Sequence, residues 1–349
     1  LSDKWGRRPI ILISLLGAGV SHLIFAFGTN LWVLFLARGL AGVFGANIST
    51  AMAYIADITP PKDRSKGMGL IGAAFGLGFM LGPFIGGIAG QIGPHLGSNP
   101  PLGEGFAALV ASIICFANFL FAYSFLAESI SPEVKQHHKK RPPRLKKIIE
   151  YLKIPLMPSL MGSFFLGILA MANMEAALFL FVKDDFSWSV SQASYGFAYV
   201  GLIMVFTQGY LIRKVTPLWG ERNVLVIGTT LLSLGLLGIG LSSSLAPLAI
   251  SVTTLAVGNG LMHPSATGSI SLIAPKDDQG GVMGANQSLS AMGRIIGPAI
   301  GGYLYEISHP SPFLLGSAFT FLALLIILSV WKKLPDTRGI KKQTTPVSS

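Results

Sequence analysis

Long apolar segments are the feature that most limits what this chain can fold into. Ten can be drawn, each close to the roughly 20 residues that cross about 30 Å of hydrocarbon as an α-helix. Because 51% of the residues are apolar and only 12% are charged, too few charged side chains remain to cover a soluble globule. The sequence therefore predicts an all-α polytopic membrane protein. The predicted segments are 10–28, 31–56, 66–92, 106–127, 156–182, 191–212, 223–242, 246–273, 281–305 and 312–331.

The longest connection between these segments is polar and strongly basic, and it divides the helices into four and six. We predict a first half at 1–127, a central loop at 128–154, a second half with six helices at 155–334 and a tail at 335–349. Two further helices before Leu1 would make the two halves equal. An N-terminal truncation is therefore expected.

The positions of the basic residues predict the orientation of the chain. If residues 1–9 are cytoplasmic, all but three of the 26 Lys and Arg residues fall in cytoplasmic segments, the exceptions being Arg38, Lys183 and Arg294. This distribution follows the positive-inside rule. Both chain ends and the 128–154 loop are thus expected in the cytoplasm, in a plasma (inner) membrane. The net charge of +11 then points to the lipid bilayer as partner, and no nucleic-acid partner is expected.

A motif of glycines and one proline occurs twice in the chain. Every position of the first copy is separated from its counterpart by 215 residues, and both copies begin a helix on the same predicted side. Parallel repeats of this kind indicate two pseudo-symmetric halves. The glycines allow close helix contact, and a buried proline bends a helix. The copies are Gly69, Gly78, Gly82, Pro83, Gly86 and Gly87, and Gly284, Gly293, Gly297, Pro298, Gly301 and Gly302.

These features together resemble the major facilitator superfamily, and within it the drug:proton antiporters of the multidrug and tetracycline efflux type. Residues 1–9 resemble the signature loop between the second and third helices. Residues 34–46 resemble the fourth-helix motif with Arg38 in register, although Ala41 replaces the usual glutamine. Residues 69–87 resemble the fifth-helix antiporter motif. The resemblance covers essentially the whole chain and implies that the ten helices are family helices 3–12.

The resemblance implies a secondary transporter that works by alternating access. Proton-coupled efflux of small amphipathic compounds is the first function it suggests, with a small-molecule substrate and protons as partners and a monomer as the expected state. A sugar or metabolite symporter or uniporter of the same fold is the alternative. A non-transporting membrane scaffold or receptor is a third interpretation, which the intact motifs and the intramembrane charges disfavour.

The signature loop also implies a cytoplasmic latch. In such proteins the loop carboxylate, here Asp3, lies at a helix N-terminus, and the following arginine, Arg7, pairs with the acidic residue that ends the fourth helix, Asp57. A carboxylate at a helix N-terminus is favoured by the helix dipole and by free N–H groups. The alternative is a set of solvated loop charges, each of which contributes little.

Three charged residues lie at membrane depth in the predicted segments, where ionisable groups are costly and are by default functional candidates. They are Arg38, Glu175 and Arg294. Our hypothesis is that Glu175 carries the coupled proton or binds a cationic substrate, with Arg38 tuning it. The alternatives are that Glu175 pairs with an arginine for structural reasons or faces the outer vestibule.

Polar side chains within the apolar segments are candidates for a substrate cavity. They are Asn47, Asn173, Asn259 and His263, of which the last two lie one turn apart on a single helix. Hydrogen bonding between helices is the commoner role of such groups.

Several classes of function lack their sequence signatures here. The chain has no Gly-x-x-x-x-Gly-Lys-Ser/Thr loop for ATP and no Ser/His/Asp or metal-ligand cluster, and its one cysteine, Cys115, lies in an apolar run. We therefore predict no enzyme activity, no catalytic residue, no metal and no cofactor.

Overall fold

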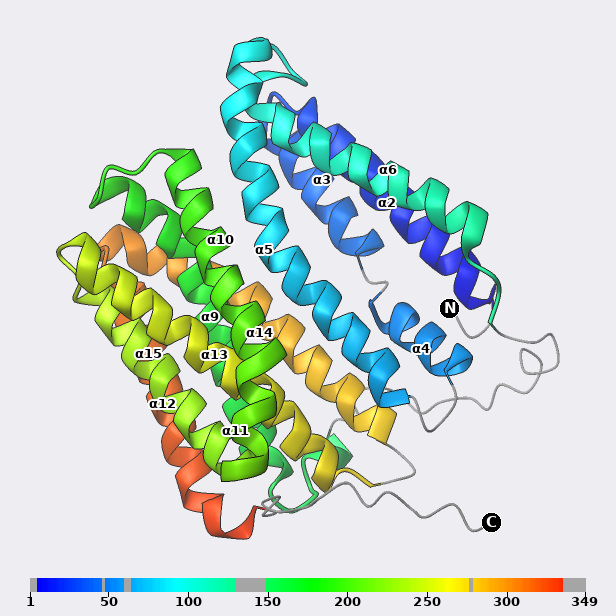
Figure 1. Ribbon diagram of the computed structural model, residues 1–349. Helices are drawn as coiled ribbons and strands as arrows, with labels where there is room; N and C mark the ends of the chain where they lie inside the picture. Colours follow the sequence, from blue (N-terminus) through cyan, green and yellow to red (C-terminus); the bar gives the residue numbers. More distant parts are fainter. Residues whose placement is uncertain (1–4, 46–47, 60–63, 130–148, 276–278, 335–349) are drawn as a thin grey trace. The chain divides into compact units, whose positions relative to one another are not determined.

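Helices occupy all ten predicted segments in the computed structural model, which describes residues 5–45, 48–59, 64–129, 149–275 and 279–334. Asp3, Asn47, most of the 128–154 loop and the 335–349 tail lie outside these described residues. The helices, labelled in Figure 1, are α2 (Arg7–Ala26), α3 (Leu31–Phe44), α4 (Ile48–Ile58), α5 (Arg64–Leu96), α6 (Phe106–Phe125), α9 (Met157–Asp184), α10 (Val190–Phe206), α11 (Ile212–Trp219), α12 (Glu221–Gly240), α13 (Leu245–Ile273), α14 (Gln279–Ile307) and α15 (Ser311–Val330).

The composition of these helices suits a lipid environment. Within the described residues, seven helical spans are long and apolar enough to cross a membrane, and α3 is a shorter apolar helix. Large apolar side chains also point outward, as at Trp32, which is 83% exposed, and Phe125, which is 75% exposed. Exposing apolar surface of this extent to water is unfavourable, whereas contact with the hydrocarbon of lipid tails is not.

Internal contacts group the chain into two units. Unit 1 comprises Leu1–Arg141 together with Val190–Ala198, and unit 2 comprises Pro142–Ser189 together with Tyr199–Ser349. The first turns of α10 thus belong to unit 1 and the rest of that helix to unit 2.

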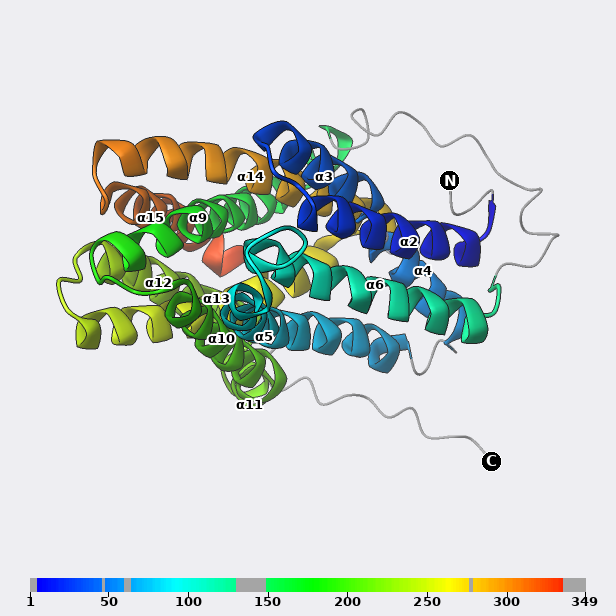
Figure 2. The same cartoon turned by 90° about the horizontal axis from the view of Figure 1, so that it is seen from above.

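In unit 1, α2 packs against α3 and along the length of α6, as Figures 1 and 2 show. The helices α2 and α6 approach closely at Gly19, where an added Cβ would lie 3.0 Å from the Phe116 ring. Here Ser112 Oγ donates a hydrogen bond of 2.8 Å to the Gly19 carbonyl. Because hydrocarbon offers no other partner to a serine hydroxyl, this bond fixes the contact between the two helices.

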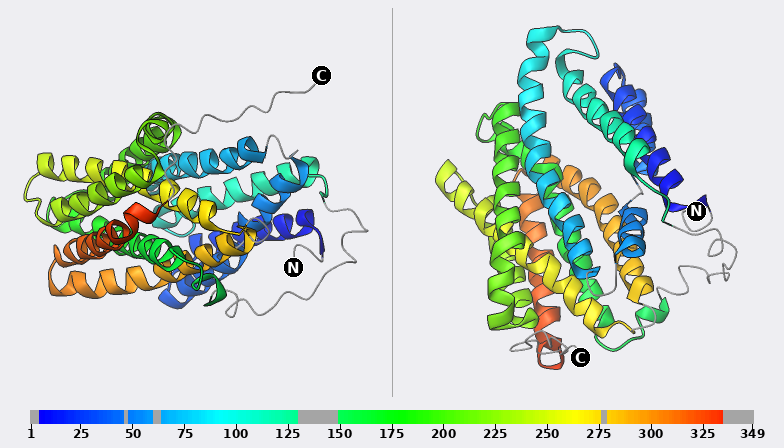
Figure 3. Two further views of the ribbon diagram at one scale, coloured as in Figure 1. Left: turned by 90° about the horizontal axis from the view of Figure 1, so that it is seen from below. Right: turned by 45° about the vertical axis from the view of Figure 1, so that its right-hand side comes forward.

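Unit 2 repeats this arrangement with different residues. The helix α12 packs on α13 and α15, and α9 packs on α14 and α15. In Figure 3, α9 is green, α12 and α13 are yellow-green to yellow, α14 is orange and α15 is red. Ser317 Oγ of α15 donates to the Ser233 carbonyl of α12 at 2.9 Å, at the positions that correspond to Ser112 and Gly19. The internal repeat predicted from the glycines therefore extends to an interhelical hydrogen bond.

The helices α2 and α12 also begin alike. Each follows a glycine with positive φ, Gly6 at 107° and Gly220 at 77°, a conformation that other residues adopt at a cost. The second residue of each helix is an arginine that lies over an aromatic ring. Arg8 lies over Tyr123, which is near the end of α6, and Arg222 lies 4.6 Å from the centroid of Trp331, which follows α15.

The second glycine motif forms the surface against which α9 packs on α14. A Cβ added at Gly297 would lie 2.7 Å from Ala172 Cβ, and one at Gly301 would lie 2.6 Å from the carbonyl oxygen of Asn173. Only glycine permits this approach. In unit 1, by contrast, a Cβ at Gly78, Gly82 or Gly86 of α5 would meet nothing within 4 Å among the described residues. Within the described part of unit 1, these three glycines therefore have no close packing partner, whereas a Cβ at Gly87 would lie 2.9 Å from Ser194 Cβ.

Two predicted segments differ in detail from the structure. The segment 31–56 forms α3 and α4 rather than one helix, and Gly45 ends α3 with its N–H donating to the Ala41 carbonyl at 2.8 Å. The local run of glycines, which have low helix propensity, explains this end. The segment 191–212 continues to Trp219 through η3, a π-helical turn at Thr207–Leu211.

Gly301→Ala tests the close contact of α14 with α9. The added methyl group meets the Asn173 carbonyl, so we expect the free energy of unfolding to fall by about 1–3 kcal/mol, as for other overpacked sites. Gly302→Ala is the matched control, since a Cβ there meets nothing within 4 Å among the described residues. Thermal unfolding of both variants in detergent measures the difference, and equal stability of the two would contradict the contact.

Candidate functional site

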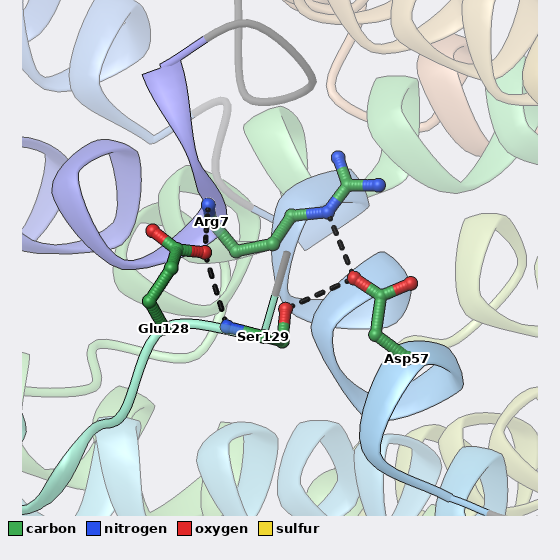
Figure 4. Close-up of polar contacts among 4 residues, drawn as sticks. All are labelled: Arg7, Asp57, Glu128 and Ser129. Atoms are coloured by element: carbon green, nitrogen blue, oxygen red, sulfur yellow. Dashed lines mark hydrogen bonds and ion pairs between the residues drawn. The ribbon is translucent and has the colours of Figure 1, made fainter. Parts of the chain in front are cut away.

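A polar cluster lies at the end of unit 1 where α2 begins and α4 ends (Figure 4). Arg7 Nε donates to Asp57 Oδ2 at 3.1 Å, with side-chain exposures of 13% and 29%. Ser129 Oγ donates to the same carboxylate oxygen at 3.0 Å. The pairing of Arg7 with Asp57 that the signature-loop resemblance implied is thus present in unit 1, whereas Asp3 lies outside the described residues.

The segment after α6 completes this α2–α4 polar cluster, defined as Arg7, Asp57, Glu128 and Ser129. Glu128 Oε1 accepts hydrogen bonds from the backbone N–H groups of Arg7, at 2.9 Å, and of Ser129, at 3.0 Å. Because Arg7 is the first residue of α2, the carboxylate lies at the positive end of the helix dipole. Three separate segments are thereby tied together by charge-assisted hydrogen bonds.

Sequence reasoning missed Glu128 and Ser129. They are the first two residues of the predicted central loop, and no motif marks them. The only available signal was the placement of an acidic residue next to the most basic stretch of the chain. Their role depends on a contact between residues 121 positions apart, which periodicity cannot indicate.

Unit 2 carries a charged face at membrane depth. Glu175 on α9 and Arg294 on α14 are both exposed in the unit, although most of α9 around Glu175 is buried. Arg294 is close enough to interact electrostatically with Glu175 and also with His263 of α13. Contact with lipid would cost each charge several kcal/mol, so a polar compartment is the physically favoured surrounding of this face.

Arg38 lies in unit 1, where its guanidinium carbon is 5.5 Å from the centroid of the Phe25 ring. It also interacts electrostatically with His22 of α2. Since Glu175 belongs to unit 2, the idea that Arg38 tunes Glu175 stays a prediction. Within unit 2, the arginine beside Glu175 is Arg294.

The predicted cavity residues are placed differently from one another. Asn173 is fully buried, and its Nδ2 donates to the Pro312 carbonyl at 2.6 Å. Asn259 is 9% exposed on α13. His263 is partly buried, with its ring 4.9 Å from that of Phe164. The placement of Asn173 favours a role in helix packing, whereas His263 lies next to the charged face.

Comparisons with known proteins agree with this architecture. A family model described as the Major Facilitator Superfamily matches residues 1–219 and 180–348. The chain belongs to this superfamily. Among its relatives, the class B tetracycline resistance protein of Escherichia coli is 29% identical over 99% of this chain and 84% of the relative. Multidrug resistance protein 1 of Bacillus subtilis is 32% identical over 95% of this chain and 81% of the relative.

Solved structures give the same fold. The crystal structure of the human organic anion transporter MFSD10 (TETRAN) matches with a TM-score of 0.69 and 26% identity, over 93% of this chain and 78% of that one. A POT family transporter matches with a TM-score of 0.70 at 15% identity, over 95% of this chain and 83% of that one. The predicted all-α major facilitator fold is confirmed, and the chain is an integral membrane transporter of small molecules.

A double-mutant cycle tests the Arg7–Asp57 pair in this transporter. Arg7→Gln, Asp57→Asn and the double variant should give a coupling of about 1 kcal/mol in the free energy of unfolding, at the upper end for partly exposed pairs. Thermal unfolding in detergent measures it. Arg213→Gln is the control, since Arg213 is an exposed arginine on α11. Strictly additive effects of the two substitutions would show that the ion pair contributes nothing.

Asn173→Ala tests whether this side chain holds α9 to the start of α15. We expect a loss of about 1–3 kcal/mol in the free energy of unfolding, because the variant removes a buried hydrogen bond and leaves a small cavity. Asn118→Ala is the control, since Asn118 is exposed on α6. If both variants unfold at the wild-type temperature, the packing role of Asn173 is excluded.

Proposed function

We propose that this protein is a proton-coupled efflux transporter of small amphipathic compounds that works by alternating access. The observation that carries the proposal is the presence of a carboxylate, Glu175, and a guanidinium, Arg294, on an exposed face of unit 2, near enough to interact electrostatically. A carboxylate and a guanidinium at membrane depth are retained at an energetic cost, and such groups mark ion and substrate pathways.

The names of the relatives support the substrate class. The matched proteins include tetracycline resistance proteins and multidrug resistance proteins, each similar along nearly all of this chain. The resemblance of residues 69–87 to the antiporter motif supports export rather than uptake. Tetracycline and ethidium, an amphipathic zwitterion and an amphipathic cation, are therefore the first compounds to test.

Coupling follows from the charge of Glu175. A cationic group of the substrate and a proton both neutralise the carboxylate, so they compete for one site. Competition of this kind is what an antiporter requires. The binding site turns to face one side of the membrane with substrate bound, and turns to face the other side with the proton bound. Binding near the midplane between the two halves is general for such folds.

The α2–α4 polar cluster has a separate part in this proposal. In family members the signature loop closes the cytoplasmic side, and the Arg7–Asp57 pair at 3.1 Å supports a latch of that kind. Contacts among Arg7, Asp57, Glu128 and Ser129 fix the start of α2 against α4 and the segment after α6, and so support the signature loop without involving the substrate.

A second candidate function, transport of an organic anion, is favoured by the balance of charge. The predicted membrane segments contain two arginines, Arg38 and Arg294, but one carboxylate, Glu175. The solved human relative is named an organic anion transporter. Protonation of Glu175 would leave Arg294 without its counterion and so favour binding of an anion, which produces symport of proton and substrate rather than antiport.

Flux in proteoliposomes tests the first proposal and separates it from the second. With an imposed pH gradient, we expect tetracycline or ethidium to accumulate on the acidic side while protons move the opposite way, as a pH-sensitive dye reports. Glu175→Gln should lower this gradient-driven accumulation at least about tenfold, because the variant cannot exchange a proton. Glu306→Gln, at an exposed carboxylate near the end of α14, is the matched control.

The alternatives give different results in the same vesicles. Co-movement of protons with p-aminohippurate, and none with the two drugs, would favour the organic-anion symporter. A Glu175→Gln protein that still couples drug flux to the pH gradient would remove Glu175 as the proton site. Absence of flux for all three compounds would contradict both transport proposals.

A further inference from the structure

One ionisable residue at membrane depth has no part in the function proposed above. His263 lies in α13, immediately before Pro264, and its ring lies against that of Phe164 of α9, with the ring planes tilted by 57°. In the described residues no side-chain hydrogen bond holds the imidazole, whose own backbone carbonyl accepts from Thr267. Imidazole is the side chain whose protonation changes most readily near neutral pH, and an ionisable residue inside a membrane protein is by default a functional candidate.

Contacts between helices show the level of His263 relative to the charged face. The residue beside Arg294, Gly293, lies against Ile168 and Leu169 of α9, so Arg294 is level with this part of α9. Glu175 lies six residues further along α9, or about 9 Å at 1.5 Å per residue. Phe164, which contacts His263, lies five residues in the other direction, or about 7 Å.

The three ionisable groups therefore form a column in unit 2 in the order Glu175, Arg294 and His263. The helices that carry them, α9, α14 and α13, are in mutual contact (Figure 1). Arg294 interacts electrostatically with both of the other groups. The helix α9 begins at the predicted cytoplasmic side, so Glu175 is the outer member of the column and His263 the inner one.

The other charges that face α13 are few in the described part of unit 2. On α12, the Glu221 carboxylate lies 3.0 Å from the position of a Cβ at Gly268, five residues beyond His263 toward the predicted cytoplasmic end. The helix α9 presents Glu175 and the helix α14 presents Arg294. Beyond the burial of the imidazole itself, Arg294 is thus the charged side chain that acts on His263 in the described part of unit 2.

We propose that His263 is a second proton-binding site of this transporter and that, through Arg294, Glu175 and His263 share one proton. When Glu175 is protonated, Arg294 lacks a counterion and repels a charged imidazolium. When Glu175 releases its proton, its negative charge offsets Arg294 and protonation of His263 becomes less costly. Double protonation is therefore disfavoured, which is the condition for passing a single proton along the column.

The proton balance of this route is simple. One proton binds the Glu175 carboxylate from the outer side, leaves it for the imidazole of His263 through solvent in the polar compartment, and is released from His263 to the cytoplasmic side. Glu175 ends ionised and His263 ends neutral, so both groups return to their starting states. This route rests on the proton coupling proposed above, but the shared proton is measurable without any transport substrate.

Histidine NMR of the purified protein in detergent tests the proposal directly. The resonances of His263 are assigned by their loss in His263→Gln, and their pH titration is followed from pH 4 to pH 9. Arg294→Gln should raise the midpoint by about one pH unit or more, since a positive charge that interacts with the imidazole is removed. Glu175→Gln should lower it by about half a unit. Arg294→Lys, which keeps the charge, should leave it near the wild-type value.

The same spectra contain their own control. His309 lies outside the column, 2.7 Å from Asp185 at the far end of α9, and its resonances serve as the reference in each variant. A His263 that stays neutral throughout, or titrates identically in wild type, Arg294→Gln and Glu175→Gln, would overturn the proposal. That result would leave drug efflux itself untouched.

Transport by His263→Gln provides the second measurement, in the vesicles described above. We expect accumulation of tetracycline driven by a pH gradient to fall at least about fivefold, while exchange of labelled for unlabelled tetracycline at equal pH continues. Exchange needs no net proton release, so its survival also shows that the variant is folded. Unchanged gradient-driven accumulation would exclude His263 as a proton site, whereas a wild-type protein without tetracycline flux would contradict the proposed function and leave the NMR result to decide the shared proton.

Discussion

The close approach of α9 and α14 is the constraint on which the rest of unit 2 depends. Gly293, Gly297 and Gly301 bring the two backbones together, and Asn173 sits at the tightest point with its amide bonded to the Pro312 carbonyl. This contact fixes the relative heights of the two helices. Since Glu175 and Arg294 project from them, the glycines also determine how far apart the two charges lie.

Membrane solvation explains why so many polar groups in this protein are held by helices rather than by loops. Serine hydroxyls bond to carbonyls of neighbouring helices at Ser112 and Ser317, and the arginines at the starts of α2 and α12 lie over aromatic rings. In hydrocarbon, a polar group without a hydrogen-bond partner in the protein cannot bond to water instead. Charges that remain exposed in one unit, as at Glu175, therefore require an explanation beyond packing.

The sequence predicted the architecture better than it predicted contacts. Hydrophobic length and the 215-residue repeat located the helices and the glycine motifs, because these properties are local or are copied between halves. The end of α3 at Gly45 and the π-helical turn between α10 and α11 were missed, since each depends on small energetic differences within an apolar run. Glu128 and Ser129 were missed because a single carboxylate at the start of a loop forms no sequence pattern. The interaction of Arg294 with Glu175 could not be predicted without knowing the relative heights of α9 and α14.

The π-helical turn at Thr207–Leu211 has a consequence for how this family of sequences can vary in length. Such a turn contains one residue more than the α-helical turn it replaces. Deleting one residue there therefore restores regular helix and leaves the apolar face of α10 in the same orientation relative to the basic, amphipathic α11. Thr207 is fully buried against Gly260, which anchors the turn from one side. Homologous chains are therefore expected to differ in length by a single residue at this turn. The sequences on both sides of the turn should still align without further gaps, although the difference lies inside a transmembrane helix.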